Sequence, residues 1–553
     1  MAGSNAADLL VRSLAAHGCD RVFCVPGESF LPVLDALHGR VSPDLVVCRH
    51  EGGAGLMALA DAKLTGRPGV AFVSRGPGAC NAAIAVHMAE QDAAPLVLFV
   101  GQVERKDRGR GAFQEVDYGR MFAGMAKAVE EVQSADRVSE ACARAFHAAA
   151  SGTPGAAVVV LPEDMLFDPT DAPVVPPAPL AVPQPGPAEL AAAARMIASA
   201  DRPILVAGGC LQSGRGRTAL LAAAEALQVP VAVTNKRQDL FPNDHPLWAG
   251  HLGYAAARPL VEALSAADLV VAVGTRLGDV STQGYALPRA PVPAQPLIHV
   301  HPDPSQVGRV FVPTLGMAAD PAATLEGLAA VAGRPRERAG WLARVTSVAR
   351  GLQAYATPIV DDGVPFGEVV VALGPLLPDD AILSIDAGNF VSWVHRHWVR
   401  RGDQILLGAV GGGMGGGVPG GVAAALRHSA RTVVAIVGDG GMMMTGNEMM
   451  VAVARRARLV VIVADNGSYG TIRTHQERAF PGRVSGTDLA NPDFAALARA
   501  FGARGLSLRP GTDPAQVLED PLAHDGVTLV HVGASLEAIS ANATLAEMRA
   551  RAG

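Results

Sequence analysis

Short runs of consecutive apolar residues recur along the chain and alternate with longer alanine-rich stretches. Runs of four to six apolar, often β-branched residues are typical of strands buried on both faces, and helices between them favour parallel sheets. The predicted strands are 21–25, 45–48, 70–73, 96–100, 157–160, 204–207, 229–233, 269–273, 297–300, 381–385, 432–437, 459–464 and 528–532. The pattern therefore predicts an α/β protein with three doubly wound parallel-sheet domains.

Two changes in composition divide these strands into groups. Eight prolines lie between positions 168 and 188, and because proline lacks a backbone N–H, this segment is predicted to be an extended linker. Around 333–364 the chain becomes Arg-rich and loses its strand-like runs, which indicates a second, more helical connection. The predicted units are a first domain at 1–165, the linker at 166–188, a middle domain at 189–332, the connection at 333–364, a third domain at 365–535 and a C-terminal tail at 536–553.

Composition excludes several classes of function. The 553 residues are 49% hydrophobic and 18% charged, which supplies several apolar cores, and the formal net charge of −6 predicts no nucleic-acid partner. No apolar run approaches the length of a membrane span, and no signal peptide is visible. Six scattered cysteines without a CxxC pair are typical of reduced thiols. We expect a cytoplasmic protein that acts on small molecules.

Polar residues follow two neighbouring strands of the third domain. Gly438-Asp439-Gly440 ends one predicted strand, and Asn466 ends the next, 27 positions later. A right-handed crossover places such strand ends side by side, at the edge of the sheet where ligands bind. A carboxylate and an amide oxygen suit Mg²⁺, and Gly440 and Gly441 allow an anion to approach the backbone. On its own, Gly-Asp-Gly is equally consistent with a tight turn.

The spacing of this pair resembles the fingerprint of the thiamine-diphosphate-dependent enzymes, a family that includes acetolactate synthase, pyruvate oxidase and benzoylformate decarboxylase. By this resemblance, Asp439, Asn466 and the backbone oxygen of Ser468 hold Mg²⁺ against the diphosphate of thiamine diphosphate. The family usually has Asn-Asn where this chain has Asp465-Asn466. The second position, which is the metal ligand, is retained.

Further motifs extend the resemblance to acetolactate synthases over nearly the whole chain. They are, in order, Phe23–Leu37, Arg49-His50-Glu51, Gly76–Asn81, Gly101–Val103 with Gly111–Glu115, Ala387–Phe390 and Gly412–Pro419. The resemblance implies a pyrimidine-binding domain, a middle domain and a diphosphate-binding domain. It also implies a homodimer or homotetramer whose active sites combine Glu51 of one chain with the cofactor held by Asp439 of another.

The resemblance assigns a role to each matched residue. Glu51 bonds the aminopyrimidine ring of the cofactor and promotes deprotonation of its thiazolium carbon; an acid that merely stabilises a helix N-terminus is the alternative. Met414 bends the cofactor. The other implied cofactor contacts are Gly388, Asn389, Gly438, Gly440, Gly441 and Tyr469. The implied reaction is decarboxylation of a 2-oxo acid followed by carboligation to an acceptor.

Candidate substrate residues depart from the acetolactate synthase pattern in part. The candidates are Gly27, Glu28, Phe113, Gln114, Lys127 and His475. His475 replaces a Trp that favours the acceptor, and Val280 replaces an Arg that binds the acceptor carboxylate. An Arg–carboxylate contact is worth about 1.5–3 kcal/mol, so an uncharged acceptor is expected to compete well. Glu28 replaces a Gly and leaves open a benzoylformate-decarboxylase-type enzyme that releases an aldehyde.

The middle domain leaves flavin binding open. Arg105, Arg276 and Asp303 match positions that hold FAD in acetolactate synthases, whereas Gly253-Tyr254-Ala255-Ala256 replaces the flavin loop of the family. Any FAD would be structural, because the reaction involves no net redox change. A non-catalytic cofactor-binding subunit is a second alternative, against which the joint retention of Glu51, Asp439 and Asn466 argues.

Overall fold

The computed structural model describes residues 4–254, 256–333 and 336–552. The outermost ends of the predicted first domain and tail, part of the predicted connection and Ala255 lie outside these ranges. The chain forms three six-stranded sheets, and every pairing between named strands of the described residues is parallel. The predicted fold class is confirmed.

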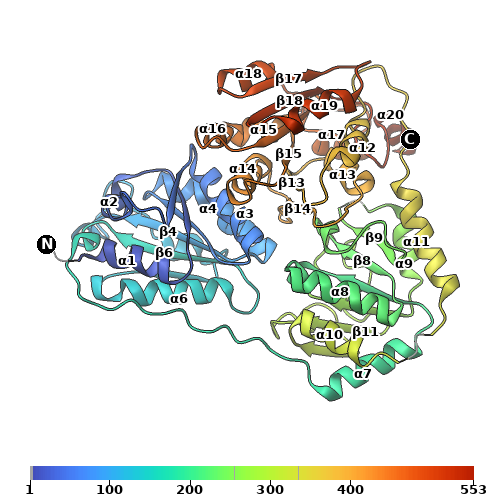
Figure 1. Ribbon diagram of the computed structural model, residues 1–553, viewed down its shortest axis with the longest axis horizontal. Helices are drawn as coiled ribbons and strands as arrows, with labels where there is room; N and C mark the ends of the chain where they lie inside the picture. The colour runs from blue at the N-terminus through green and yellow to red at the C-terminus, as the bar shows by residue number, and fades with distance from the viewer. Residues whose placement is uncertain (1–3, 255, 334–335, 553) are drawn as a thin grey trace.

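The first sheet carries helices on both faces (Figure 1). Its strands, in spatial order, are β2 (Asp44–Val47), β1 (Arg21–Cys24), β3 (Gly69–Val73), β4 (Leu96–Gln102), β6 (Ala156–Pro162) and β5 (Ala128–Glu131). Its helices are α1 (Ala6–Ala16), α2 (Leu31–Leu37), α3 (Glu51–Thr65), α4 (Pro77–Asp92), α5 (Tyr118–Phe122) and α6 (Val138–Ala150). Residues 171–186, which follow this domain, form neither helix nor strand.

The middle sheet has the same parallel architecture. Its strands, in spatial order, are β12 (Leu315–Ala318), β11 (Leu297–His301), β10 (Leu269–Val273), β7 (Pro203–Ala207), β8 (Val231–Thr234) and β9 (Trp248–Leu252). Its helices are α7 (Pro187–Ser199), α8 (Gly214–Leu227), α9 (Arg258–Ser265) and α10 (Pro321–Ala330). Helix α11 (Ala339–Gln353) then leads to the third domain along one side of the molecule (Figure 1).

The third sheet follows the order of the first. Its strands are β14 (Ile405–Gly408), β13 (Ile382–Ile385), β15 (Val433–Gly438), β16 (Leu459–Asp465), β18 (Val527–Gly533) and β17 (Arg504–Leu508). Its helices are α12 (Phe366–Leu376), α13 (Val391–His397), α14 (Gly417–Arg427), α15 (Asp439–Thr445), α16 (Met449–Ala454), α17 (Gly470–Ala479), α18 (Phe494–Ala500), α19 (Pro514–Ala523) and α20 (Leu545–Ala552). Among the helices described here, none is long and apolar enough to cross a bilayer.

Every predicted strand is present, but five further strands were missed. These are β5, β9, β12, β14 and β17, and each lies at the edge of its sheet. An edge strand has only one strand neighbour, and polar residues interrupt β5, β9 and β17, whereas β12 and β14 are short apolar stretches that contain a glycine. The pattern of apolar runs therefore detects the sheet centres better than the sheet edges.

Helices α3, α4 and α14 pack together between the first and third domains (Figure 1). Buried residues of all three helices belong to one apolar core, which spans both domains. Close packing depends on small residues there, because a Cβ added to Gly55 would lie 2.5 Å from the Cβ of Ala85. At the C-terminal end of α14, the Arg427 guanidinium binds Asp20 and Asp61 of the first domain at 2.8 and 2.7 Å. The first and third domains are thus held in a fixed relation.

Candidate functional site

The Gly-Asp-Gly segment lies where the sequence predicts it. Strand β15 ends at Gly438, α15 begins at Asp439, and Asn466 directly follows β16, which pairs with β15. Asp439 is buried, with 4% of its surface exposed. The side-chain oxygen of Asn466 accepts a hydrogen bond from the Ser468 amide at 3.1 Å. The two predicted metal ligands therefore project from adjacent strand ends.

A second carboxylate and an amide complete this cluster. Asn491 Nδ2 donates to Asp439 Oδ2 at 2.8 Å and to Asp465 Oδ1 at 2.7 Å. His531 Nε2 lies 2.8 Å from the other oxygen of Asp465. Burial raises the pKa of Asp439 to about 6. Burial also opposes ionisation of Asp465, but its hydrogen bonds to His531 and Asn491 outweigh burial and lower its pKa.

This arrangement fits a divalent cation. The Asn491 NH2 group bridges the two carboxylates, and a bound cation would relieve the cost of keeping Asp439 charged in a buried position. Among the described residues, no group of three or more His, Cys, Asp or Glu is placed to hold a metal. The candidate metal set consequently needs amide and backbone oxygens beside Asp439, as Asn466 and Ser468 supply.

Glycines beside Asp439 leave room for four larger side chains. A Cβ on Gly440 would lie 2.6 Å from the Tyr469 ring and 3.1 Å from the Met414 methyl carbon. A Cβ on Gly438 would lie 2.9 Å from the Phe390 ring, and one on Gly441 would lie 2.6 Å from Asp386 Oδ2. The structure thus brings Met414 and Tyr469, which are far apart in sequence, together beside the candidate metal ligands.

The loop after β13 is fixed to the same site. Gly388 has a φ of +152°, a conformation that favours glycine. Asn389 Nδ2 donates to the Gly470 carbonyl at 3.1 Å, which ties this loop to the start of α17. The buried Asp386 accepts hydrogen bonds from the amides of Gly415 and Gly417 at 2.9 and 3.3 Å. Asp386 therefore anchors the loop that carries Met414.

Glu51 begins α3 at the carboxyl edge of the first sheet. Its Oε2 accepts a hydrogen bond from Asn81 Nδ2 at 2.9 Å, and the preceding His50 caps the helix by accepting from the Gly52 amide. Within the described residues, Glu51 makes no hydrogen bond or ion pair with Asp439 or Asn466 of the same chain. The carboxyl group is thus positioned through one oxygen, and among the described residues the other oxygen accepts no hydrogen bond.

The start of α3 is held by a carboxylate from the third domain. Glu448 Oε1 accepts hydrogen bonds from the amides of Arg49 and His50 at 3.1 and 2.8 Å. A Cβ on Gly53 would lie 2.2 Å from that oxygen. Burial raises the pKa of Glu448 to about 7, and the negative charge of Glu51 contributes in the same direction.

Several substrate candidates converge on the same edge of the first sheet as Glu51. A Cβ on Gly27 would lie 2.6 Å from the Cβ of Ser74, which directly follows β3. A Cβ added to Gly76 would lie 2.8 Å from the Cβ of Gln114, so these two residues are in close contact. The Glu28 side chain is 65% exposed, and Phe113, which directly precedes Gln114, is 76% exposed. Glu28 and Phe113 therefore lie at the surface.

Two other candidates lie elsewhere. Lys127 directly precedes β5, at the edge of the sheet opposite to Glu51; its ammonium donates to the Ser151 carbonyl, and burial lowers its pKa. Within this chain Lys127 therefore lies away from Gln114, because amino and carboxyl ends of parallel strands lie at opposite edges, and its role in the substrate channel stays a prediction. His475 lies on α17, where its Nε2 is 2.9 Å from the Tyr254 hydroxyl of the middle domain.

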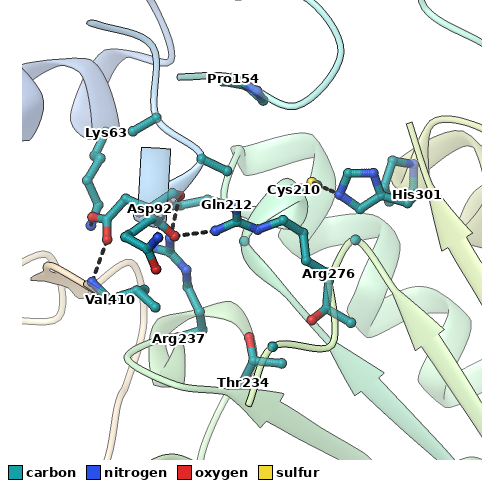
Figure 2. A pocket seen from close by; sticks show the side chains of 18 of the residues that line it. Lys63, Asp92, Pro154, Cys210, Gln212, Thr234, Arg237, Arg276, His301 and Val410 are labelled. Carbon is teal, nitrogen blue, oxygen red and sulfur yellow. Dashed lines mark hydrogen bonds and ion pairs between the residues drawn. The ribbon is translucent and has the colours of Figure 1, made fainter. Parts of the chain in front are cut away.

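A cavity of about 1080 Å³ lies where the three domains meet (Figure 2). Its lining includes Arg276, Val280 and Cys210 of the middle domain, Asp92 of the first and Val410 of the third. Arg276 donates to the Glu90 carbonyl at 3.1 Å. Arg276 is thus the candidate flavin residue that faces the cavity.

The other two flavin candidates are engaged elsewhere. Arg105 binds Asp164 and Asp168 at 2.8 and 2.7 Å. Asp303 accepts a 2.7 Å hydrogen bond from the Thr153 hydroxyl. The described part of the cavity wall contains neither Arg105 nor Asp303.

The sequence did not predict Glu448, Asn491 or Asn81 as parts of the site, and each of them contacts residues that are distant in sequence. Glu448 binds amides about 400 positions away, and Asn491 joins Asp439 to Asp465 from a loop. Asn81 belongs to the Gly76–Asn81 motif, for which no role was predicted, and it donates a hydrogen bond to Glu51. No local pattern marks these partners, because each contact depends on the tertiary fold.

Comparison with known protein families identifies all three domains. Residues 4–121 match the N-terminal TPP binding domain of thiamine pyrophosphate enzymes, residues 190–328 match the central domain, and residues 386–532 match the C-terminal TPP binding domain. These matches follow the same order as the three sheets.

Individual relatives cover nearly the full chain. An acetolactate synthase large subunit from Mycobacterium tuberculosis is 31% identical, over 93% of this chain and 85% of its own. The acetolactate synthase isozyme 2 large subunit of Escherichia coli is 31% identical, over 96% of this chain and 95% of its own. A putative thiamine pyrophosphate-containing protein from Bacillus subtilis is 29% identical, over 96% of this chain and 92% of its own. The relatives favour the carboligase interpretation.

The first prediction concerns Glu448. Because its pKa is raised from 4.5 to about 7, the folded state is favoured while the carboxyl group is protonated, and it loses about 3 kcal/mol as pH rises through this range. Glu448→Gln should remove this loss. The thermal unfolding midpoint of Glu448→Gln minus that of wild type should therefore increase between pH 5 and pH 8. For the control Glu262→Gln, at an exposed residue, the same difference should not change with pH. A constant difference for Glu448→Gln would contradict the assignment.

Proposed function

The chain belongs to the thiamine pyrophosphate enzymes and is acetolactate synthase-like, and from this premise we propose that it decarboxylates a 2-oxo acid and transfers the remaining acyl unit to an acceptor. The observation that carries the proposal is the cluster of Asp439, Asn466 and Ser468 at adjacent strand ends, with Met414 and Tyr469 beside it. When bound, thiamine diphosphate supplies the nucleophilic carbon and the electron sink for decarboxylation.

The third domain would hold the diphosphate through Mg²⁺. Asp439, the Asn466 amide oxygen and the Ser468 carbonyl are the proposed protein ligands. The buried position of Asp439 beside the strand end that carries Asn466 supports this proposal, since a cation would stabilise its ionised form. We propose that Gly438, Gly440 and Gly441 provide the close backbone approach, and that the anchored loop holds Met414 against the cofactor.

Glu51 is the proposed catalytic residue. Its position at the start of α3, with one oxygen bound by Asn81 and the other without a hydrogen bond among the described residues, suits a carboxyl group that shares a proton with an aminopyrimidine ring. The backbone contacts of Glu448 fix the segment that presents this carboxyl group. Glu51 would thereby hold the proton at the atom where cofactor activation needs it.

A complete site would combine two chains. Glu51 makes no contact with the Asp439 cluster of its own chain within the described residues, and Met443, Met444 and Ile472 near that cluster are about half exposed. A partner chain would cover this apolar surface and bring its own Glu51 to the cluster. We therefore propose a homodimer, or a dimer of dimers, with isologous contacts.

One part of the acceptor side of the site would lie at Val280 and His475. Gln283 donates to the carbonyls of Val280 and Gly253 at 2.7 and 3.2 Å, and the adjacent Tyr254 contacts His475. This chain of contacts supports the proposal that both substituted positions belong to the acceptor side. Neither Val280 nor His475 supplies the permanent cation of an arginine, which supports an uncharged acceptor.

Any FAD would occupy the cavity at Arg276. Its volume of about 1080 Å³ suits a large ligand. Arg276 could contact a phosphate there, whereas Arg105 and Asp303 are already engaged by neighbouring side chains. Such a flavin would have a structural role.

Removal of Asp439 tests the cofactor site. Asp439→Ala removes the proposed carboxylate ligand, so we expect the affinity for thiamine diphosphate with Mg²⁺ to fall at least about a hundredfold in calorimetry. Far-UV circular dichroism should be unchanged. The exposed Asp520→Ala, which loses only an ion pair to Arg504, serves as the control. Wild-type affinity in Asp439→Ala would show that the metal ligands lie elsewhere.

Product partitioning tests the reaction. With labelled pyruvate and an equal concentration of a neutral aldehyde, wild type should release carbon dioxide and form more mixed product than acetolactate. Val280→Arg combined with His475→Trp should shift the products toward acetolactate, and Glu51→Gln should suppress both. If acetolactate dominates in wild type, the acceptor argument fails; if free aldehyde dominates, the enzyme is a decarboxylase.

A further inference from the structure

Arg75 is a buried cation between two carboxylates. It follows Ser74 at the end of β3, and only 8% of its surface is exposed. Its Nη2 binds Glu28 Oε1 at 2.8 Å, and its Nη1 binds Glu163 Oε2 at 2.6 Å. The three side chains together carry one net negative charge, and both terminal nitrogens of the guanidinium are occupied.

The loop that carries Glu28 is bound by the backbone amide of Arg75 as well as by its side chain. The Arg75 amide donates to the Ser29 hydroxyl at 3.2 Å, and that hydroxyl lies 2.9 Å from the Ser74 hydroxyl. Gly27, at the start of this loop, packs against Ser74 with no space for a side chain. The residues directly before and after Glu28 therefore both contact the segment that follows β3.

The Glu28 carboxylate lies at the surface, with one of its two oxygens bound by Arg75. The side chain is 65% exposed, and within the described residues Oε2 accepts no hydrogen bond. The end of β3 also approaches Glu51, since a Cβ on Gly78 would lie 3.5 Å from both Glu51 Oε1 and the Cβ of Ser74. Glu28 thus combines a fixed position with a free, negatively charged edge near the candidate catalytic residue.

We propose that Arg75 is a positioning residue that fixes Glu28 as a negative charge in the acceptor pocket, so that the enzyme selects neutral acceptors and rejects carboxylates. This inference rests on the proposed function and narrows its acceptor to aldehydes or ketones without an acid group. A neutral acceptor with a hydroxyl group can also donate a hydrogen bond to Glu28 Oε2. Coulomb repulsion disfavours an acceptor that carries a second carboxylate.

Arg75 is unsuited to bind a substrate carboxylate directly. Its two terminal nitrogens already bind Glu28 and Glu163, and its remaining nitrogen, Nε, is buried without a partner among the described residues. A substrate carboxylate would have to displace Glu28 from a short ion pair. The guanidinium acts through Glu28.

Two matched acceptors test the proposal. Glycolaldehyde and glyoxylate are both two-carbon aldehydes, but only glyoxylate carries a carboxylate. The two acceptors compete at equal concentration in one reaction with labelled pyruvate. A change in the rate of pyruvate decarboxylation alters both products equally, so the ratio of the two products reports only the choice of acceptor. We expect wild type to favour glycolaldehyde, and Glu28→Gln to shift the ratio about tenfold toward glyoxylate.

A second measurement needs no turnover. Calorimetry with unreactive glycolate and glycolamide should show tighter binding of the amide to wild type and a similar tenfold relative gain for glycolate in Glu28→Gln. If the chain proves not to ligate acceptors, the proposed function fails, while this binding ratio still tests the charge at Glu28. An unchanged binding ratio in Glu28→Gln, or no binding of the amide to wild type, would overturn the proposal.

Arg75→Lys distinguishes positioning from a general structural role. Lysine keeps the charge but loses the fork that binds two carboxylates at once, so discrimination against glycolate should fall about threefold. In the Glu28→Gln background, Arg75→Lys should leave the ratio unchanged, because Arg75 acts through Glu28. Arg144→Lys, in a surface ion pair of α6, is the control. Equal effects of Arg75→Lys in both backgrounds would contradict the proposal.

Discussion

The contact between Glu448 and the backbone before α3 is the interaction on which the candidate active site depends. One buried carboxylate from the third domain accepts hydrogen bonds from the amides of Arg49 and His50, immediately before Glu51. Gly53 allows this approach, since any side chain would overlap Glu448. The shared core of α3, α4 and α14 surrounds the contact. The position of Glu51 is therefore set by the third domain as well as by the first sheet.

Parallel sheets determine where the remaining chemistry lies. Glu51 and Arg75 lie beyond the carboxyl ends of β2 and β3, and Asp439 and Asn466 lie beyond those of β15 and β16. One sheet edge carries an acid and the exposed Glu28, and the other carries oxygen ligands beside glycines that leave little room for side chains. In the proposed function, two such halves from different chains would form the complete site.

The sequence predicted local features well and distant partners poorly. The central strands carry continuous apolar runs, and all were predicted; the five missed strands lie at sheet edges, where polar residues or glycines shorten the apolar run. Asp439 and Asn466 were predicted because one crossover fixes their relation. Asn491 and Glu448 were missed since their partners are distant in sequence. Lys127 was grouped with Gln114 from a resemblance alone, and the direction of β5 places it at the opposite edge of the sheet.

The most direct test of the account is complementation between two inactive variants. Glu51→Gln lacks the acid but keeps the metal ligands, and Asp439→Ala lacks a metal ligand but keeps the acid. If each active site combines two chains, co-expressed variants should regain about a quarter of wild-type activity, because half of the dimers are mixed and each mixed dimer contains one intact site. Activity no higher than that of the separate variants, in a preparation shown to contain mixed dimers, would contradict the account.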